Sequence, residues 1–128
     1  MHDRFVSHLY RGVADVAAAN ELLVREGHEG LRLVDNGAAA EGGHTYHLIP
    51  ATASKAAAVQ LHMRARAFSP EECVAVGDSL EDLGVAPVVG RFFMVANGPS
   101  EASGPNVTRT DSGFGDGFYE AIVQSLVQ

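Results

Sequence analysis

The chain has 128 residues, 46% of them hydrophobic and 20% charged, a composition typical of one globular domain and not of a disordered segment. Nine basic and 16 acidic side chains give a net charge of -7, which disfavours nucleic acid or an anionic membrane as partner and fits a divalent cation. No apolar run approaches the roughly 20 residues that span a bilayer, and the N-terminus has no signal-peptide pattern. The single cysteine, Cys73, lies in the apolar run ECVAVG and predicts a core position in a protein of the reducing cytoplasm.

The first 50 residues predict one helix followed by two strands. Apolar residues recur at helical spacing in VADVAAANELLVRE, so we expect a helix from about Gly12 to Glu26, ending before Gly27. LRLVDNG and HTYHLIP then alternate like strands of a short β-ribbon. The Asn36–Gly37 dipeptide is a hairpin signal, and we therefore place Asp35 in the hairpin turn.

The remaining sequence predicts strands that alternate with helices. The run SKAAAVQLHMRARA favours a helix with Ser54 as N-cap, which puts Lys55 in its first turn. ECVAVGD and FFMVANG are short apolar strands separated by the helical DSLEDLGVAPVVG. A very short strand at 106–108 and a closing helix in GFYEAIVQSLV complete the pattern. This order indicates an α/β fold with a parallel, Rossmann-like sheet and flanking helices.

Three carboxylates follow the first of these strands, in the sequence GDSLED. Because ligands gather beyond the carboxyl ends of parallel strands, Asp78 is placed to bind a hard cation such as Mg²⁺. If Ser79 opens the next helix, Asp82 lies one turn from Asp78 and reaches the same site or the free N–H groups of the helix. The simpler alternative is that Asp78 or Ser79 caps the helix, with Glu81 and Asp82 favouring its positive end.

Lys55 is the second candidate, because a cation in the first turn of a helix opposes the helix dipole. An ammonium in this position can hold a phosphoryl group and a carboxylate nucleophile together by offsetting their repulsion. The alternative is an ordinary solvated surface lysine.

From about His47 onward the sequence resembles the C-terminal half of haloacid dehalogenase superfamily phosphatases. Lys55 in LIPATASKAAAV is similar to that family's motif III lysine, and GDSLED to its motif IV acidic loop. MVANG and NVTRTDSGFGDGFYEAI resemble its closing strands and helix. The branch with the cap between the second and third motifs, the Cof-like and sugar-phosphate phosphatases, is the most similar one. The resemblance makes residues 1–45 the end of an α+β cap and residues 46–128 the C-terminal half of the core.

This resemblance implies Mg²⁺-dependent hydrolysis of small phosphorylated metabolites, with sugar phosphates as the expected substrates. It makes Asp78 the metal ligand, Lys55 the contact to the phosphoryl group, and Asp82 the second acid that orients the loop or a metal-bound water. Glu81 stands where the branch usually has Asn, so its role stays open. The turn around Asn97 matches a loop near the site in this branch, although a structural turn is the preferred interpretation.

The family's nucleophile motif, an apolar strand ending in Asp-x-Asp-x-Thr or Val, has no convincing counterpart here. In LRLVDNGA, Asp35 follows an apolar strand, but Gly37 replaces the second aspartate. The chain therefore resembles a C-terminal fragment that alone is inactive. Its incomplete sheet predicts self-association, by edge pairing or by swapping of the N-terminal helix and ribbon, or pairing with a separate N-terminal half.

Histidines and the cap add weaker candidates. His44 and His47 point to opposite faces of a strand, which favours solvated or hydrogen-bonded side chains over a zinc site. His28, Arg32 and His44 are expected to touch substrate in an intact enzyme, since caps of the resembling family select it.

Three functions fit the sequence. The first is part of a Mg²⁺-dependent phosphatase, and the second is a binding or interaction module without turnover. The third, an unrelated nucleotide-binding α/β domain, is disfavoured because no glycine-rich phosphate loop follows a strand.

Overall fold

The computed structural model describes residues 8–127 and divides into two compact units, Met1–Ala53 and Ser54–Gln128. The predicted end of the cap at residue 45 stays a prediction, although a cut there would fall inside the strand His44–Pro50. That strand pairs with two others of the first unit, so the division follows it, at Ala53 and Ser54.

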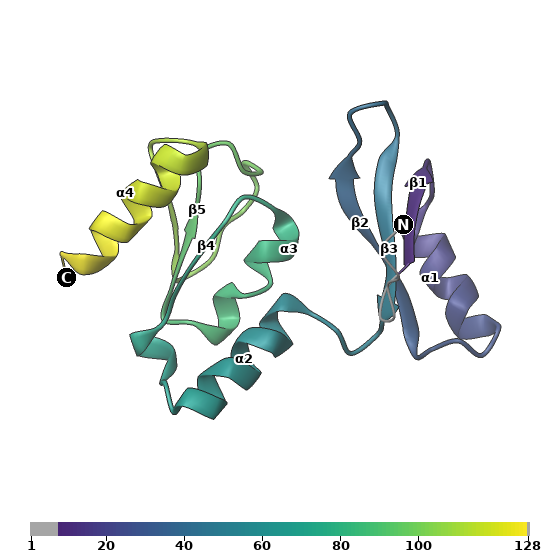
Figure 1. Cartoon of the computed structure of the whole chain (residues 1–128), viewed down its shortest axis with the longest axis horizontal. Helices are drawn as coiled ribbons and strands as arrows, with labels where there is room; N and C mark the ends of the chain where they lie inside the picture. The colour runs from purple at the N-terminus through teal and green to yellow at the C-terminus, as the bar shows by residue number, and fades with distance from the viewer. Residues whose placement is uncertain (1–7, 128) are drawn as a thin grey trace. The chain divides into compact units, whose positions relative to one another are not determined.

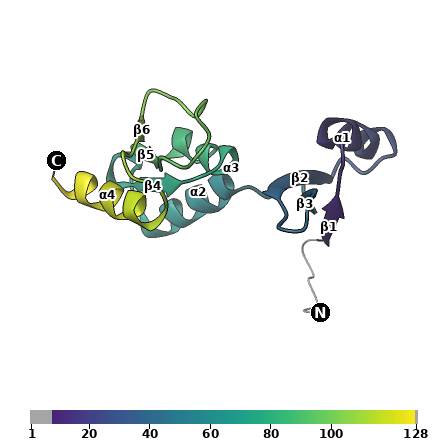
Figure 2. The ribbon, with the colours of Figure 1, turned by 90° about the horizontal axis from the view of Figure 1, so that it is seen from above.

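The N-terminal unit is a three-stranded antiparallel sheet with one helix. Strands β1 (His8–Gly12), β2 (Leu31–Ala38) and β3 (His44–Pro50) have the order β1-β3-β2. Helix α1 (Val16–Arg25) lies along one face of this sheet (Figures 1 and 2). Asn20 fixes it there, since its amide nitrogen donates to the Leu33 carbonyl at 3.0 Å and its amide oxygen accepts from the Leu33 N–H at 2.7 Å. The predicted helix and ribbon are both present.

The predicted start of the helix at Gly12 is wrong. Residues His8–Gly12 form β1, which the sequence interpretation missed, and Gly12 has a φ of 149°. The helix begins at Val16 because Asp15 is its N-cap, with its carboxylate accepting from the Ala18 N–H at 3.0 Å. Pairing with β3 outweighs the helical spacing of the early residues.

The hairpin turn also differs from the prediction. Asn36 and Gly37 lie inside β2, where the register with β3 shifts between Asp35 and Ala38. Gly37 adopts a φ of 95° in this irregularity, and the chain reverses after Ala38, where Gly42 and Gly43 also have positive φ. Asp35 is therefore a strand residue opposite Tyr46, not a turn residue. The Asn-Gly signal marks a bulge here because the two later glycines make the turn.

The C-terminal unit is a parallel sheet flanked by helices, so the predicted α/β class is confirmed. Strands β4 (Val74–Gly77), β5 (Arg91–Met94) and β6 (Val107–Arg109) have the order β4-β5-β6. The helical elements are α2 (Lys55–Arg66), η1 (Pro70–Glu72), α3 (Leu80–Leu83), η2 (Ala86–Val88) and α4 (Phe114–Leu126). Every helix among the described residues is too short or too polar to traverse a bilayer.

The core of this unit is centred on β5. Phe92, Phe93 and Met94 are 0–1% exposed, because a central strand is covered on both faces. Cys73 is partly buried and packs against this core, as its apolar context predicted. The most rigidly packed strand thus lies beside β4, which carries the acidic loop.

Candidate active site

The acidic loop begins at Gly77, the last residue of β4. A Cβ atom at this position would lie 2.3 Å from the Asp82 Cβ and 2.9 Å from the Phe92 ring. Glycine is needed here because the loop folds back directly onto the end of the strand. The close approach brings Asp82 against the backbone of the residues that precede it.

Asp82 and Ser79 tie the loop to itself. The Ser79 hydroxyl accepts from the Asp82 N–H at 3.2 Å, which makes Ser79 the N-cap of α3. One carboxylate oxygen of Asp82 accepts from the Asp78 N–H at 3.1 Å and from the Ser79 hydroxyl at 2.9 Å. Asp82 thus reaches back to the residue before the N-cap, and its predicted part in the same site as Asp78 stays a prediction.

Lys55 meets the same carboxylate from a different element. Ser54 caps α2 as predicted, accepting from the Ala57 N–H at 3.0 Å, and this places Lys55 in the first turn. The Lys55 Nζ lies 2.6 Å from the other oxygen of Asp82 and 3.6 Å from a Glu81 oxygen. The two sequence motifs, 27 residues apart, are therefore one cluster. Glu81, whose role was left open, is part of this cluster.

Electrostatics in the cluster favour the charged forms. The hydrogen bond to Asp82 is the main cause that raises the pKa of Lys55 above 10.5, assisted by the charges of Asp82 and Glu81 and opposed by partial burial. Burial alone would raise the pKa of Asp82. The hydrogen bonds from Lys55, the Asp78 N–H and Ser79 outweigh it and lower that pKa below 3.8. Lys55 is thus protonated and Asp82 ionised near neutral pH, as an ion pair requires.

Asp78 and Asp82 both line a cleft, but Asp78 is exposed whereas Asp82 is partly buried. The cleft has a volume of about 370 Å³ and lies beyond the carboxyl end of β4. Phe114, Gly115 and Phe118, from the first turns of α4, line it together with Val95 and Asp82. The side chain of Asp78 is therefore accessible to a ligand at the position where parallel sheets bind theirs.

The residues fit Mg²⁺ only as one part of its coordination shell. Within residues 8–127, no three His, Cys, Asp or Glu side chains are grouped so that they would hold a metal ion. Mg²⁺ is often bound by one or two carboxylates, with water and substrate phosphate as the other ligands. Asp78 fits as one such carboxylate, whereas both oxygens of Asp82 already accept hydrogen bonds.

The loop around Asn97 has a structural role that the sequence interpretation favoured. The Asn97 side chain accepts from the Phe114 N–H at 2.5 Å and so fixes the start of α4 at the cleft. Arg109, which we did not single out, donates to the carbonyls of Val95 (3.3 Å), Ala96 (3.5 Å), Gly98 (3.2 Å) and Pro99. An arginine at the end of a three-residue strand gives no pattern that would predict this clamp.

The remaining sequence candidates all belong to the N-terminal unit. His44 is hydrogen-bonded, with its Nδ1 2.6 Å from an Asp35 oxygen and its ring stacked on Tyr46. His28 is exposed after the end of α1, and Arg32 donates to the Ala53 carbonyl at 2.5 Å. Their contact with substrate stays a prediction.

The chain belongs to the haloacid dehalogenase-like hydrolases. A family model of that description matches residues 31–122, a range that includes Lys55, Asp78 and Asp82. The match covers both the lysine and the acidic loop that form the cluster.

Curated relatives include two proteins named phosphoglycolate phosphatase. The one from Natronomonas pharaonis is 34% identical over 62% of this chain and 35% of its own length. The one from Methanoculleus marisnigri is 31% identical over 85% of this chain and 47% of its own length. The chain thus spans between a third and a half of the relatives that it matches.

Solved structures show the same fold. A sucrose-phosphatase from Synechocystis aligns with a TM-score of 0.73 and 19% identity, over 95% of this chain and 52% of that one. A haloacid dehalogenase-like hydrolase from Bacteroides thetaiotaomicron aligns with a TM-score of 0.71 and 19% identity, over 94% and 44%.

Proposed function

We propose that the chain supplies the lysine and acidic-loop half of a Mg²⁺-dependent phosphatase site for small phosphorylated metabolites. The observation that carries this proposal is the 2.6 Å ion pair between Lys55 and Asp82 beside the exposed Asp78. Phosphoryl transfer depends mainly on positioned charges, and here the first turn of α2 supplies one cation while the acidic loop supplies one accessible carboxylate. Bound Mg²⁺ would neutralise the charge of the phosphoryl group.

Each residue has a distinct proposed role. Asp78 is the metal ligand, because its carboxylate is exposed at the cleft. Lys55 contacts the phosphoryl group, and Asp82 holds both Lys55 and the Asp78 backbone in place. Glu81 adds a second, more distant carboxylate to the lysine. The nucleophile is expected from a segment that these residues do not include, and the single Cys73 fits a cytoplasmic setting.

Among substrates, sugar phosphates were the expectation from the sequence, and the relatives' name adds 2-phosphoglycolate. The test is a titration of the chain with Mn²⁺ as a paramagnetic substitute for Mg²⁺, observed by NMR, next to an assay of aryl phosphate hydrolysis. We expect Mn²⁺ to broaden the amide signals of residues 77–82 in the wild type and not in Asp78→Asn. We also expect no hydrolysis of the aryl phosphate by the chain alone. Broadening that survives Asp78→Asn would contradict the proposed ligand, and hydrolysis that this variant abolishes would contradict the missing nucleophile.

A binding module without turnover is the second candidate. It is favoured by one observation, that both oxygens of Asp82 accept hydrogen bonds, which leaves fewer carboxylate oxygens of the loop for a catalytic cation. Two results together would support this candidate. Inorganic phosphate and Mn²⁺ would bind together, and no ester in a panel including 2-phosphoglycolate and glucose 6-phosphate would be hydrolysed, even when a relative's N-terminal half is added.

We propose further that β4 pairs with a second strand, supplied by another copy or by an N-terminal half. No described strand lies on its outer side. The Cys73 and Gly77 carbonyls accept hydrogen bonds from N–H groups of β5 and of the residues just before and after it. Because backbone groups alternate in direction along a strand, those of Val74 and Val76 point to the open edge. The strand VAVG has none of the charges or prolines that usually protect an edge.

Sedimentation at high protein concentration tests this pairing. We expect a dimer, and a monomer for Val76→Pro, because that change removes an N–H from the open edge while leaving the bonds to β5 intact. Leu61→Glu, at a 63% exposed position of α2, is the control that should remain dimeric. A strictly monomeric wild type excludes pairing between copies.

A further inference from the structure

Two Asn-Gly dipeptides occur in this chain, Asn36–Gly37 and Asn97–Gly98. In such a pair the main-chain nitrogen of the glycine can attack the side-chain amide of the asparagine, because glycine has no side chain to obstruct the approach. The rate of this attack at each pair depends on how the fold holds the reacting atoms. Both asparagines are exposed to solvent, so access to water does not distinguish them.

The Asn97–Gly98 pair is held by hydrogen bonds and by packing. The Asn97 side-chain oxygen accepts from the Phe114 N–H at 2.5 Å, and the Gly98 N–H donates to the Val95 carbonyl at 2.8 Å. A Cβ at Gly98 would lie 2.4 Å from the Met94 sulfur, which shows how little room the glycine has. The nitrogen and the side-chain carbon cannot meet unless these bonds break, so we expect this pair to be stable.

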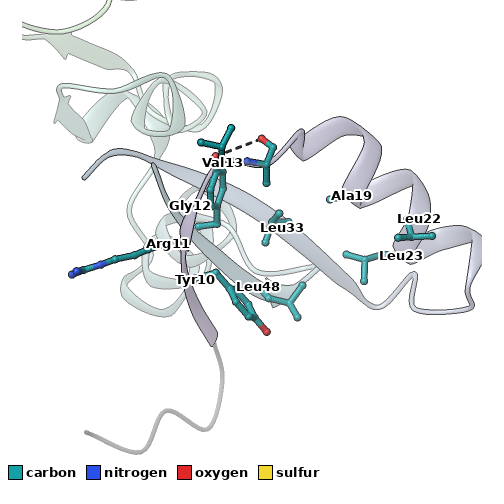
Figure 3. A pocket seen from close by; sticks show the side chains of 11 residues that line it. Tyr10, Arg11, Gly12, Val13, Ala19, Leu22, Leu23, Leu33 and Leu48 are labelled. Carbon is teal, nitrogen blue, oxygen red and sulfur yellow. Dashed lines mark hydrogen bonds between the residues drawn. The ribbon is translucent and has the colours of Figure 1, made fainter. Parts of the chain in front are cut away.

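The Asn36–Gly37 pair lies in the irregular part of β2 and is open. The apolar cavity between α1 and the sheet reaches β2 at Leu33 (Figure 3), and residues 35–38 are exposed beyond it. The register with β3 shifts between Asp35 and Ala38, and Asn36 and Gly37 have no partner residue there. Gly37 has a φ of 95°, and a Cβ built on it would have open space around it. Movement of these atoms toward each other is therefore not obstructed.

Asp35 lies against the attacking nitrogen. Its Oδ1 accepts from the Gly37 N–H at 2.8 Å, and its Oδ2 lies 2.6 Å from the His44 Nδ1. The bond from Gly37 is the main cause that lowers the pKa of Asp35 below 3.8, with His44 assisting, so the group is a carboxylate at neutral pH. A carboxylate can take the proton of the N–H group that it binds. The Val95 carbonyl, which binds the Gly98 N–H, is not such a base.

We propose that Asn36 is a self-modifying site, at which the chain converts this asparagine to aspartate and isoaspartate. The Gly37 nitrogen attacks the Asn36 Cγ and passes its proton to the Asp35 carboxylate. The bond between Cγ and Nδ2 breaks, and the nitrogen takes up that proton and leaves as ammonia. Water then opens the cyclic imide, at Cγ to give aspartate or at the main-chain carbon to give isoaspartate. No group is oxidised or reduced, and Asp35 ends as a carboxylate again.

The products change the bulge of β2. Both carry a carboxylate at position 36, and isoaspartate also adds a carbon atom to the main chain. The imide has no N–H at position 37, so the bond that Asp35 accepts is lost in the intermediate. Because the added carbon lies between Asp35 and Ala38, we expect the pairing of Ala38 with His44 to be disturbed first. The modification thus acts on the end of the β2–β3 hairpin.

Incubation of the full chain at neutral pH, followed by tryptic digestion and mass spectrometry, tests the proposal. Trypsin separates the two pairs, because peptide 33–55 contains Asn36 and peptide 92–109 contains Asn97. We expect isoaspartate to form at Asn36 about tenfold faster than at Asn97, where two hydrogen bonds must break first. In urea, where the fold no longer holds either pair, the two rates should be similar. Equal rates in the folded chain, or a reaction at Asn36 that is slower folded than in urea, would overturn the proposal.

Two variants of the hairpin distinguish a base from a structural support. Asp35→Asn keeps an oxygen that can accept from the Gly37 N–H but removes the base, so the reaction at Asn36 should slow about tenfold. His44→Gln removes the other contact of Asp35 and leaves its carboxylate in place, so the rate should stay near the wild-type value. An equal decrease in both variants, or no decrease in Asp35→Asn, would contradict the role of Asp35 as the base.

Discussion

The two sheets of this protein differ in how they are stabilised. In the C-terminal unit, β5 contributes Phe92, Phe93 and Met94 at 0–1% exposure. In the described part of the N-terminal unit, Tyr46 is the one buried hydrophobic residue, and α1 has none. The acidic loop therefore rests on a packed core, whereas the N-terminal sheet depends more on hydrogen bonds such as those of Asn20. Precise placement of charge requires the first kind of support, and the comparison predicts which substitutions affect which unit.

The largest effect is expected from Phe93→Ala. Removing a fully buried phenyl ring should lower the free energy of unfolding by about 3–5 kcal/mol through lost burial and a cavity. Hydrogen exchange should show the loss in β4 and β5 and spare β3. Phe118→Ala, at a 53% exposed position, is the control and should cost far less. Equal loss of protection in β3 would show that the two units do not unfold separately.

Gly77→Ala should cost about 1–3 kcal/mol, the usual range for overpacking, since the new methyl group would overlap the Asp82 side chain. Its amide spectrum should also change at Asp82 and Lys55, because the loop must move. Gly115→Ala has open space around its Cβ and serves as the matched control, with stability unchanged or higher. A Gly77 variant as stable as the control would refute the close packing.

Asp82→Asn should lower stability near neutral pH by about 1–2 kcal/mol, since the charge-assisted bonds to Lys55, Ser79 and the Asp78 N–H are weakened. The pKa of Asp82 is lowered in the folded chain, so its contribution is present above about pH 4 and is lost as the pH falls through the folded value. The pKa of Lys55 is raised, so its contribution is present below about pH 10 and is lost as the pH rises through the folded value.

Urea unfolding from pH 2 to pH 11 measures this dependence. The difference in the free energy of unfolding between wild type and Asp82→Asn should be greatest between about pH 4 and about pH 10 and should shrink below and above that range. A difference that is constant with pH would mean that the ion pair contributes nothing.

The smallest effect is expected in the N-terminal unit. Asn20→Ala removes both bonds to Leu33 and should cost about 1 kcal/mol, because part of each lost bond is replaced by water. Hydrogen exchange should detect it in β2 and leave β5 unaltered. Glu21→Ala, at an exposed neighbouring position of α1, is the control. Increased exchange in β5 would contradict the separation of the units.

The sequence predicted the elements that local rules control. Ser54 and Ser79 are N-caps, and apolar runs locate β4 and β5, because both patterns depend only on neighbouring residues. The strand β1 was missed because its pairing with β3, more than 30 residues away, decides its conformation. The same limit applies to the bulge at Gly37, which is set by the cross-strand register.

The candidate site was only partly predictable, because local motifs are visible in the sequence and contacts between distant residues are not. Lys55, Asp78 and Asp82 could be selected from motif and position, but the sequence could not show that Asp82 is occupied while Asp78 is exposed. Nor could it show that Glu81 joins the lysine, because that contact depends on how α2 packs near α3.

The Arg109 clamp has a consequence for sequence divergence. Its guanidinium holds the chain from Val95 to Pro99 through main-chain oxygens, which every amino acid provides. The shape of that segment is thus encoded partly at a position outside it. Within the segment, Val95 is buried and a Cβ at Gly98 would lie 2.4 Å from the Met94 sulfur, so the exposed Ala96 is the position that tolerates change most easily. Lysine at position 109 would not substitute, because a single ammonium cannot reproduce a planar fork of donors. Tolerance at Ala96 and the requirement for arginine at position 109 therefore follow from the same main-chain contacts.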